Sequence, residues 1–169
     1  MDNLKQLNNE ELINLIKAGE VTIENIVDCG ICPTCFNEKN DRVLYGDIVD
    51  KIIFEDDMFE CILVGNPRAN GHVAISTKKH FKDMMQTDDE TCQKIFLLAK
   101  KTMNILKETY NAESVYLCTM CDGPMNHFHI QLIPRYSFEE RGSNNFVKPR
   151  FNYQVDKEKL SQLRAKMNI

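Results

Sequence analysis

Two of the chain's four histidines lie one residue apart in the stretch MNHFHIQLIPR, residues 125–135. In an extended strand, successive side chains point to opposite faces, so His127, His129 and Gln131 would share one face. The opposite face comprises Phe128, Ile130 and Leu132. That face is apolar and is expected to join the core. Neighbours on the polar face are about 6.6 Å apart at a rise of about 3.3 Å per residue. This spacing is too wide for the three side chains to act on one atom, and it favours two adjacent sites, one imidazole binding a metal and the next meeting a substrate.

Two simpler interpretations of this strand remain open. The histidines could lie together by chance on a solvent-facing edge, although histidine is scarce in this chain. They could also form a plain His-x-His pair in which both imidazoles bind one ion.

A cysteine-rich stretch supplies a second set of reactive side chains. Cys29, Cys32 and Cys35 form C-x-x-C-x-x-C, and a C-x-x-C turn presents two thiolates at a separation suited to tetrahedral zinc. Two further ligands would have to come from elsewhere, and the imidazoles of the chain are those of His72, His80, His127 and His129. A redox C-x-x-C is an alternative, but the βα unit that usually precedes one is missing. The absence of any metal is the third alternative, and Cys118-x-x-Cys121 is a weaker metal-binding candidate.

The hydrophobic pattern predicts the elements that must position these residues. A helix over residues 8–18 ends at Gly19, and strands are expected at 51–55, 59–65 and 72–77. Thr87 and Glu90 form a capping-box pattern that opens a long helix to about Tyr110. Its predicted buried stripe comprises Ile95, Ala99, Met103, Leu106 and Tyr110. Two more strands follow at 114–119 and 128–134, and a last helix at about 156–167. Strands grouped around one long helix indicate an α+β fold with a mainly antiparallel sheet.

Composition narrows the classes of function. The 169 residues suffice for one domain, and 43% apolar with 27% charged residues is ordinary for a globular protein. The net charge of −4 provides no general basic field, so neither nucleic acid nor an anionic membrane is expected as a partner. Apolar runs fall far short of the roughly 18 residues of a membrane span. The N-terminus lacks a signal-peptide pattern, and an odd count of seven cysteines argues against disulfides. We therefore expect a cytoplasmic protein.

Taken together, these motifs resemble the histidine triad (HIT) superfamily. GHVAISTKKH, a long helix, a strand and HFHIQLIPR carry the resemblance, which runs from about residue 29 to residue 135. The third position of the family's His-x-His-x-His signature is Gln131 here, as in the branch that contains galactose-1-phosphate uridylyltransferases and diadenosine tetraphosphate phosphorylases. The resemblance implies a five-stranded antiparallel sheet with a packed helix, usually in a homodimer. One HIT-like domain would span residues 1–169, with a helical extension (1–28), a core (29–135) and a C-terminal extension (136–169).

The resemblance also implies roles for individual residues. His129 matches the family's nucleophile, which attacks the α-phosphate of a nucleotide and carries the nucleotidyl group as a phosphoramidate. Gln131 would donate a hydrogen bond to the phosphoryl oxygens, and the Asn126 amide is a further donor. A structural zinc ion would be bound by Cys32, Cys35, His80 and His127. Cys29 remains an alternative to either cysteine.

Some positions depart from the family pattern. Val64 stands where many members carry an acidic or amide side chain for the ribose hydroxyls, so Asn66 is the substitute candidate. The loop ahead of the strand histidines is shortened to residues 119–124. His72 is expected to support the site rather than to catalyse. The cations that could steer phosphate groups are Lys78, Arg135, Arg141 and Arg150.

The sequence thus predicts an enzyme, a nucleotidyl transferase or hydrolase that acts on a dinucleoside polyphosphate or a nucleotide sugar. A zinc-stabilised nucleotide-binding module with little or no turnover is the alternative. Val64 favours it, because the usual polar partner of the ribose hydroxyls is missing at that position. A hydrolase in which both strand histidines bind a catalytic metal is the third hypothesis.

Overall fold

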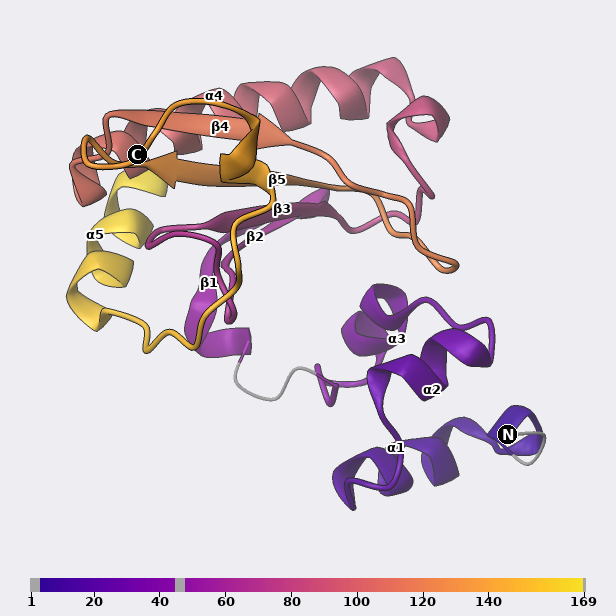
Figure 1. Cartoon of the computed structure of the whole chain (residues 1–169). Coiled ribbons are helices and arrows are strands. Elements are labelled where there is room, and N and C mark those ends of the chain that lie inside the picture. Colours follow the sequence, from indigo (N-terminus) through magenta and orange to yellow (C-terminus); the bar gives the residue numbers. More distant parts are fainter. Residues whose placement is uncertain (1–3, 45–47, 169) are drawn as a thin grey trace.

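Three short helices precede the sheet in the computed structural model, which describes residues 4–44 and 48–168 (Figure 1). They are α1 (Asn9–Lys17), α2 (Ile23–Asp28) and α3 (Pro33–Lys39). Capping boxes open the first two, Asn8 with Glu11 and Thr22 with Asn25. The predicted helix over residues 8–18 corresponds to α1, and Gly19 follows it at a positive φ of 76°. A small apolar cluster holds the three helices together and is built on Leu12, Val21, Ile26 and Phe36.

The cysteine stretch is more regular than the sequence pattern indicated, because it is not a simple turn. Cys29 caps the C-terminus of α2, and Gly30 reverses the chain at a φ of 76°. Cys32 occupies the N-cap of α3 and Pro33 its first turn, where a residue without an N–H is tolerated. Cys32 and Cys35 therefore lie at the start of a helix, one turn apart.

Five strands form one antiparallel sheet in the order β1-β2-β3-β5-β4. The strands are β1 (Ile52–Glu55), β2 (Phe59–Leu63), β3 (Val73–Thr77), β4 (Ser114–Cys118) and β5 (His129–Arg135). All five predicted strands are present, each shifted or shortened by one to a few residues at its ends. The α+β class and the five-stranded antiparallel sheet are confirmed.

The long helix α4 (Asp89–Tyr110) lies across one face of the sheet, as Figure 1 shows. Its N-cap is Asp88, whose carboxylate accepts a hydrogen bond from the N–H of Thr91 at 2.8 Å. The predicted cap at Thr87 is therefore wrong: its hydroxyl donates instead to the carbonyl of Met84 at 2.7 Å. The buried residues of α4 are Thr91, Ile95, Ala99, Thr102, Ile105, Leu106 and Tyr110. Met103, predicted in this stripe, is half-buried.

The main hydrophobic core lies between the sheet, α4 and the C-terminal helix α5 (Lys157–Met167). Phe128, Ile130 and Leu132 are 0%, 1% and 0% exposed in it, as the alternation of the strand predicted. Short 3-10 helices span Leu4–Gln6, Ile48–Lys51, Met84–Gln86 and Ser143–Phe146. No helix in the described parts of the chain combines the length and the apolar character needed to cross a membrane. Because one face of β5 is committed to this core, its polar face and the loops at the strand ends are left to build the site.

Candidate active site and metal centre

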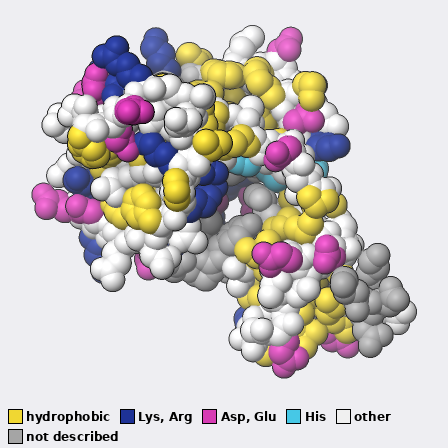
Figure 2. All heavy atoms as spheres, in the orientation of Figure 1, with side chains coloured by type: hydrophobic (Ala, Val, Ile, Leu, Met, Phe, Trp, Pro, Cys, Tyr) yellow, Lys and Arg dark blue, Asp and Glu magenta, His cyan; other side chains and the backbone are white. Residues whose placement is uncertain are grey.

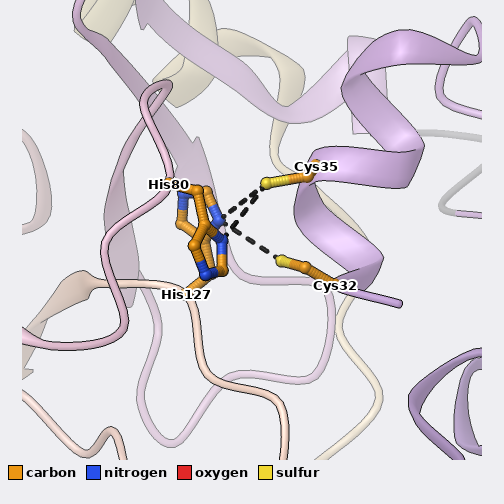
Figure 3. Close-up of side chains that lie close together, drawn as sticks. All are labelled: Cys32, Cys35, His80 and His127. Carbon is orange, nitrogen blue, oxygen red and sulfur yellow. Dashed lines mark hydrogen bonds between the residues drawn. The ribbon is translucent and has the colours of Figure 1, made fainter. Parts of the chain in front are cut away.

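Four side chains far apart in the sequence converge where α3 meets the sheet (Figure 3). Cys32 and Cys35 come from α3, His80 from the loop after β3, and His127 from the residues just before β5. Their ligand atoms all lie within 4.8 Å of one another. These are the four residues predicted to bind the metal, and this is the one such group found among the described residues. Cys29, Cys118 and Cys121 lie outside it.

The distances between the ligand atoms fit a tetrahedral metal site. Nδ1 of His127 lies 3.4 Å from the sulfur of Cys32 and 3.4 Å from that of Cys35. Nδ1 of His80 lies 3.3 Å from the sulfur of Cys35. Tetrahedral zinc with bonds of about 2.0 Å to nitrogen and 2.3 Å to sulfur has N···S edges of about 3.5 Å. Two thiols and two imidazoles at this spacing are a donor set suited to zinc.

Hydrogen bonding fixes which nitrogen of His127 faces the cysteines. Its Nε2 lies 2.5 Å from the main-chain carbonyl of Thr77, which can only accept a hydrogen bond. The Nε2 atom must therefore carry the proton, and Nδ1 is left with its lone pair toward the two sulfurs. A backbone carbonyl in this position is the usual means of orienting a metal-binding histidine. The Thr77 carbonyl was not predicted, because a main-chain acceptor leaves no signal in the sequence.

The two thiols differ in acidity. Burial raises the pKa of Cys32, but hydrogen bonds with His127 and with Cys35 outweigh this effect and lower the pKa to about 6. Burial and the neighbouring Cys32 raise the pKa of Cys35 to about 12. The cluster thus stabilises one thiolate readily, whereas the second is opposed by the charge of the first. A bound divalent cation would remove that opposition and deprotonate both thiols.

A second set of polar contacts runs along β5, next to the cysteine–histidine cluster. The ring of His129 is half-buried, its Nδ1 lies 3.0 Å from the carbonyl of His127, and its Nε2 lies 3.3 Å from the amide nitrogen of Gln131. The amide oxygen of Gln131 lies 3.1 Å from Nε2 of His72. The main-chain N–H of Arg68 donates to Nδ1 of His72 at 3.1 Å.

The N–H of Arg68, at one end of this chain of hydrogen bonds, fixes the position of every hydrogen along it. A backbone N–H can only donate, so Nδ1 of His72 accepts and its Nε2 carries the hydrogen. That hydrogen goes to the oxygen of Gln131, which turns the amide NH₂ toward His129. Nε2 of His129 therefore carries a lone pair, while its Nδ1–H donates to the carbonyl of His127. These contacts select the Nδ1–H tautomer of the imidazole, the one that a nucleophilic Nε2 needs.

His72 completes this arrangement from inside the protein. It is 1% exposed, and burial, assisted by the positive charge of Arg150, lowers its pKa to about 4. A neutral His72 agrees with its role as acceptor from Arg68 and donor to Gln131. The spacing was predicted to be too wide for the three side chains to act on one atom, yet the long side chain of Gln131 does reach the ring of His129.

The structure does not bring the two predicted substrate-binding asparagines into these contacts. Asn66 is exposed, and its main-chain carbonyl accepts a hydrogen bond from Arg150 at 2.8 Å. The amide oxygen of Asn126 would lie 3.2 Å from a β-carbon at Gly123, so this side chain lies over the shortened loop. Neither asparagine is a hydrogen-bond partner of His129 or Gln131, and their binding roles stay predictions.

Figure 2 shows where the histidines reach the surface. Histidine side-chain atoms lie in a recess between the sheet and the N-terminal helices, with Lys and Arg side chains on the sheet side of the recess. His127 is 7% exposed and is committed to the cluster with the cysteines. His129 belongs to no metal-type group of the described residues. The two strand histidines therefore have separate surroundings.

The comparisons with known proteins agree with this geometry. The family model described as the HIT domain matches residues 46–138, more than half of the 169 residues. A HIT-like protein of Methanocaldococcus jannaschii is 33% identical over 100 residues, which cover 56% of this chain and 76% of that protein. Among solved structures, a zinc-bound histidine triad family protein of Mycobacterium smegmatis has a TM-score of 0.56 at 23% identity, covering 69% of this chain and 83% of that one. A diadenosine triphosphate hydrolase of Plasmodium falciparum has a TM-score of 0.55 at 18% identity, covering 70% and 77%. At these identities the structural likenesses show the fold, and the family model and the sequence relative show more: this chain belongs to the HIT domain family.

Proposed function

We propose that this protein is a nucleotidyl transferase or hydrolase that acts at the α-phosphate of a nucleotide through a covalent intermediate on Nε2 of His129. The observation that carries the proposal is the chain of hydrogen bonds from His72 through Gln131 to His129. It makes Nε2 of His129 the acceptor nitrogen of the ring, with its lone pair in a hydrogen bond from the Gln131 amide that a bound phosphoryl group would replace. A neutral imidazole held in this way is a competent nucleophile near neutral pH.

In the first step, the lone pair of His129 Nε2 would attack the α-phosphorus. The bond from phosphorus to the bridging oxygen breaks, its electron pair leaves with that oxygen, and a P–N bond forms. The NH₂ group of Gln131 would donate to a non-bridging phosphoryl oxygen as negative charge builds there. The carbonyl of His127, which accepts from Nδ1–H at 3.0 Å, stabilises the positive charge that the ring acquires.

In the second step, water or an inorganic phosphate would attack the same phosphorus from the side of the departed group. The P–N bond breaks and its electron pair returns to Nε2, so the neutral ring is regenerated. When water is the acceptor, the attacking oxygen releases one proton to the solvent. Gln131 at the third position of the signature supports a transferase of the His-x-His-x-Gln branch. Both outcomes share the first step, and the acceptor decides between them.

We further propose that the cluster of Cys32, Cys35, His80 and His127 binds structural zinc. When bound, zinc would supply the fourfold cross-link between α3 and the loops at the ends of β3 and β5, without taking part in the reaction. The likeness to a zinc-bound member of the family and the ligand distances support this assignment.

Intact-protein mass spectrometry after brief mixing with a nucleotide substrate tests the proposed activity. The panel would include an ATP analogue, diadenosine tetraphosphate and UDP-glucose, each with and without inorganic phosphate. A nucleotidyl adduct is expected on the wild-type protein and is lost in His129→Asn, whose zinc content and Tm should match those of the wild type. An adduct that persists in His129→Asn contradicts the proposal.

One residue favours a second function, a zinc-stabilised nucleotide-binding module with little or no turnover. Val64 leaves the usual ribose position without a polar side chain, and a poorly held ribose would slow the chemistry more than it would prevent binding. Tight nucleotide binding without adduct or product across the panel would establish this alternative. A metal shared by both strand histidines has less support, because both ring nitrogens of His129 already have other partners.

We also propose that the protein is a cytoplasmic homodimer whose small-molecule partner is the nucleotide. Among the described strands, β4 lies at the edge of the sheet with a neighbour on one side only, which is compatible with a second copy. Light scattering coupled to size-exclusion chromatography would measure the mass in solution.

A further inference from the structure

Four cations were candidates for steering phosphate, and the structure separates them by their partners. Lys78 lies 2.7 Å from a glutamate, and Arg135 and Arg141 lie 3.0 Å and 3.4 Å from the carboxylate of Glu113. Arg150 differs from these three. Among the described residues, no carboxylate lies within ion-pair distance of its guanidinium, and the same holds for Arg68.

These two unneutralised arginines come from different parts of the chain and are brought together by the backbone. Arg150 donates to the carbonyl of Asn66 at 2.8 Å, and the N–H of Phe151 donates to the carbonyl of Pro67 at 3.2 Å. The guanidinium of Arg68 donates in return to the carbonyl of Lys148. The segment between β5 and α5 thus runs alongside the loop between β2 and β3, as Figure 1 also shows.

The two segments could simply hold each other through these arginine–carbonyl hydrogen bonds, but the positive charges of Arg68 and Arg150 would then remain without a counter-charge. A carbonyl oxygen satisfies one N–H of a guanidinium that has five, and it does not neutralise the charge. The Nε atom of Arg68 is buried and has no hydrogen-bond partner. Burial and the neighbouring positive charge of Arg68 lower the pKa of Arg150. Two adjacent guanidinium groups with vacant donors are the arrangement that a multiply charged anion satisfies.

The position of the pair relates it to the proposed nucleophile. The main-chain N–H of Arg68 binds His72, which binds Gln131, which in turn binds His129. Both arginines also contribute to the lowered pKa of His72, after the larger effect of burial. The charges of both guanidinium groups therefore act on His72, which is linked to His129 through Gln131.

We propose that Arg68 and Arg150 form a binding site for a chain of two or more phosphate groups beyond the α-phosphate, so that the substrate is a nucleoside or dinucleoside polyphosphate rather than a nucleotide sugar, which has one. This assignment of the substrate class rests on the proposed function of His129. When the α-phosphorus is attacked, the breaking P–O bond leaves its electron pair on the oxygen of the departing phosphate chain. The two guanidinium groups stabilise that developing charge. The C-terminal extension, outside the stretch that matches the family model, thereby takes part in substrate selection.

Calorimetric titration of the full-length protein with inorganic tripolyphosphate tests the anion site directly. Arg150→Gln is expected to weaken binding of tripolyphosphate about tenfold or more, as expected for loss of a charge-assisted hydrogen bond. Arg150→Lys, which keeps the charge, should recover part of the affinity. The control is Arg141→Gln, which makes the same change of charge at an exposed arginine that pairs with Glu113. Equal affinity of Arg150→Gln and the wild type, or equal losses in Arg150→Gln and Arg141→Gln, would overturn the proposal.

Adduct formation on His129 separates this inference from the proposed function. With diadenosine tetraphosphate as the probe, Arg150→Gln should form the adduct at least about tenfold more slowly than the wild type, whereas UDP-glucose should react equally slowly with both proteins. If the wild type and Arg150→Gln form the adduct at the same fast rate, the inference about the arginine pair is wrong, whereas the proposed function is supported. If no adduct forms but tripolyphosphate binding depends on Arg150, the proposed function fails, while the anion site is supported.

Discussion

His72 and Gln131 form a buried hydrogen bond, with Nε2 of the histidine 3.1 Å from the amide oxygen of the glutamine. Their exposed fractions are 1% and 6%. A glutamine amide can be placed in two orientations, and only one of them turns its NH₂ toward His129. Because Nδ1 of His72 is occupied by the N–H of Arg68, its Nε2 must donate, and this choice fixes the glutamine. His72 is therefore a positioning residue for the proposed nucleophile.

Replacing His72 by leucine should slow the chemistry more than it weakens binding. Leucine fills similar space but donates no hydrogen, so the Gln131 amide loses its fixed orientation. We expect the single-turnover rate of adduct formation to fall by about 10- to 100-fold, the usual effect of removing a supporting hydrogen bond in a functional site. Rapid-quench mass spectrometry would measure the rate, and equilibrium titration would show a nucleotide Kd within about threefold of the wild type.

The conservative variant His72→Gln distinguishes orientation from packing. Its side-chain amide can accept from Arg68 and donate to Gln131, so part of the lost rate should return. Equal rates for His72→Leu and His72→Gln would show that the hydrogen bond to Gln131 does not govern the chemistry.

The buried imidazole of His72 should also make stability depend on pH. Its pKa falls from the ordinary value of 6.5 to about 4 on folding, chiefly through burial. Between these values the unfolded chain binds the proton and the folded chain does not. The free energy of unfolding therefore decreases as pH falls from 6.5 to 4, and above pH 6.5 this contribution is constant. At about 1.4 kcal/mol per pKa unit, the full loss is at most about 3.5 kcal/mol.

Urea unfolding of the wild type and His72→Leu at pH 7.5, 5.5 and 4.5 would measure this effect. The cluster of Cys32, Cys35, His80 and His127 is the same in both proteins, so its contribution cancels in the difference. The stability advantage of the wild type over His72→Leu should shrink as the pH falls. An advantage that stays constant with pH would mean that His72 is protonated in both states or in neither.

Local pattern predicted the strand that carries this site but not the contacts across it. Alternation along one strand is enough to assign Phe128 and Ile130 to the core, because the period of two is a property of the strand alone. The contact between His72 and Gln131 depends on the register of β3 against β5, in which Ala74 pairs with Gln131. Such a register is set by long-range packing and turn geometry, which a single sequence does not display.

For the cysteine motif, too, the local pattern was predictable from the sequence and the three-dimensional arrangement was not. Its spacing indicated two thiolates of a metal site, yet α2 and α3 were not predicted, because helices of six and seven residues are too short for a clear periodicity. The helical N-cap geometry at Cys32 is what aims this residue and Cys35, rather than Cys29, at the two histidines.

From the sequence alone, the N-cap of α4 could be either of two adjacent residues, and mutation can test which one it is. Thr87 and Asp88 are both good capping residues. Glu90 lies three positions after Thr87 and Thr91 three positions after Asp88, and in the structure Asp88 is the N-cap. Asp88→Ala should lower the Tm by about 3 °C, because the N–H of Thr91 loses its acceptor. The matched control Thr87→Ala should lower it by less than about 1 °C. Thermal unfolding followed by circular dichroism would measure both, and a larger effect at Thr87 would restore the prediction from sequence.

Removing the proposed zinc ion should loosen the connection between two parts of the molecule that have hydrophobic cores of their own. The small cluster around Phe36 holds α1–α3 together, whereas the main core lies under α4. The four ligands span the two, since Cys32 and Cys35 come with α3 and the two histidines come with the sheet. Arg42 links the same parts through an ion pair with Glu55 at 2.6 Å, but partly exposed pairs contribute little to stability.

We therefore expect wild-type protein to carry about one zinc ion per chain, in keeping with a single tetrahedral ligand set, and Cys35→Ser to lose it. The matched control Cys29→Ser should keep the zinc, because that thiol lies outside the cluster. In the zinc-free protein, amide hydrogen exchange should accelerate across residues 9–39, while the amides of the sheet stay protected, since the main core keeps its contacts. A uniform loss of protection would mean that the metal stabilises one cooperative unit. Unchanged exchange at residues 9–39 would show that the ligands do not join the two cores, and equal zinc loss in Cys29→Ser would remove the assignment of Cys32 and Cys35 as the pair.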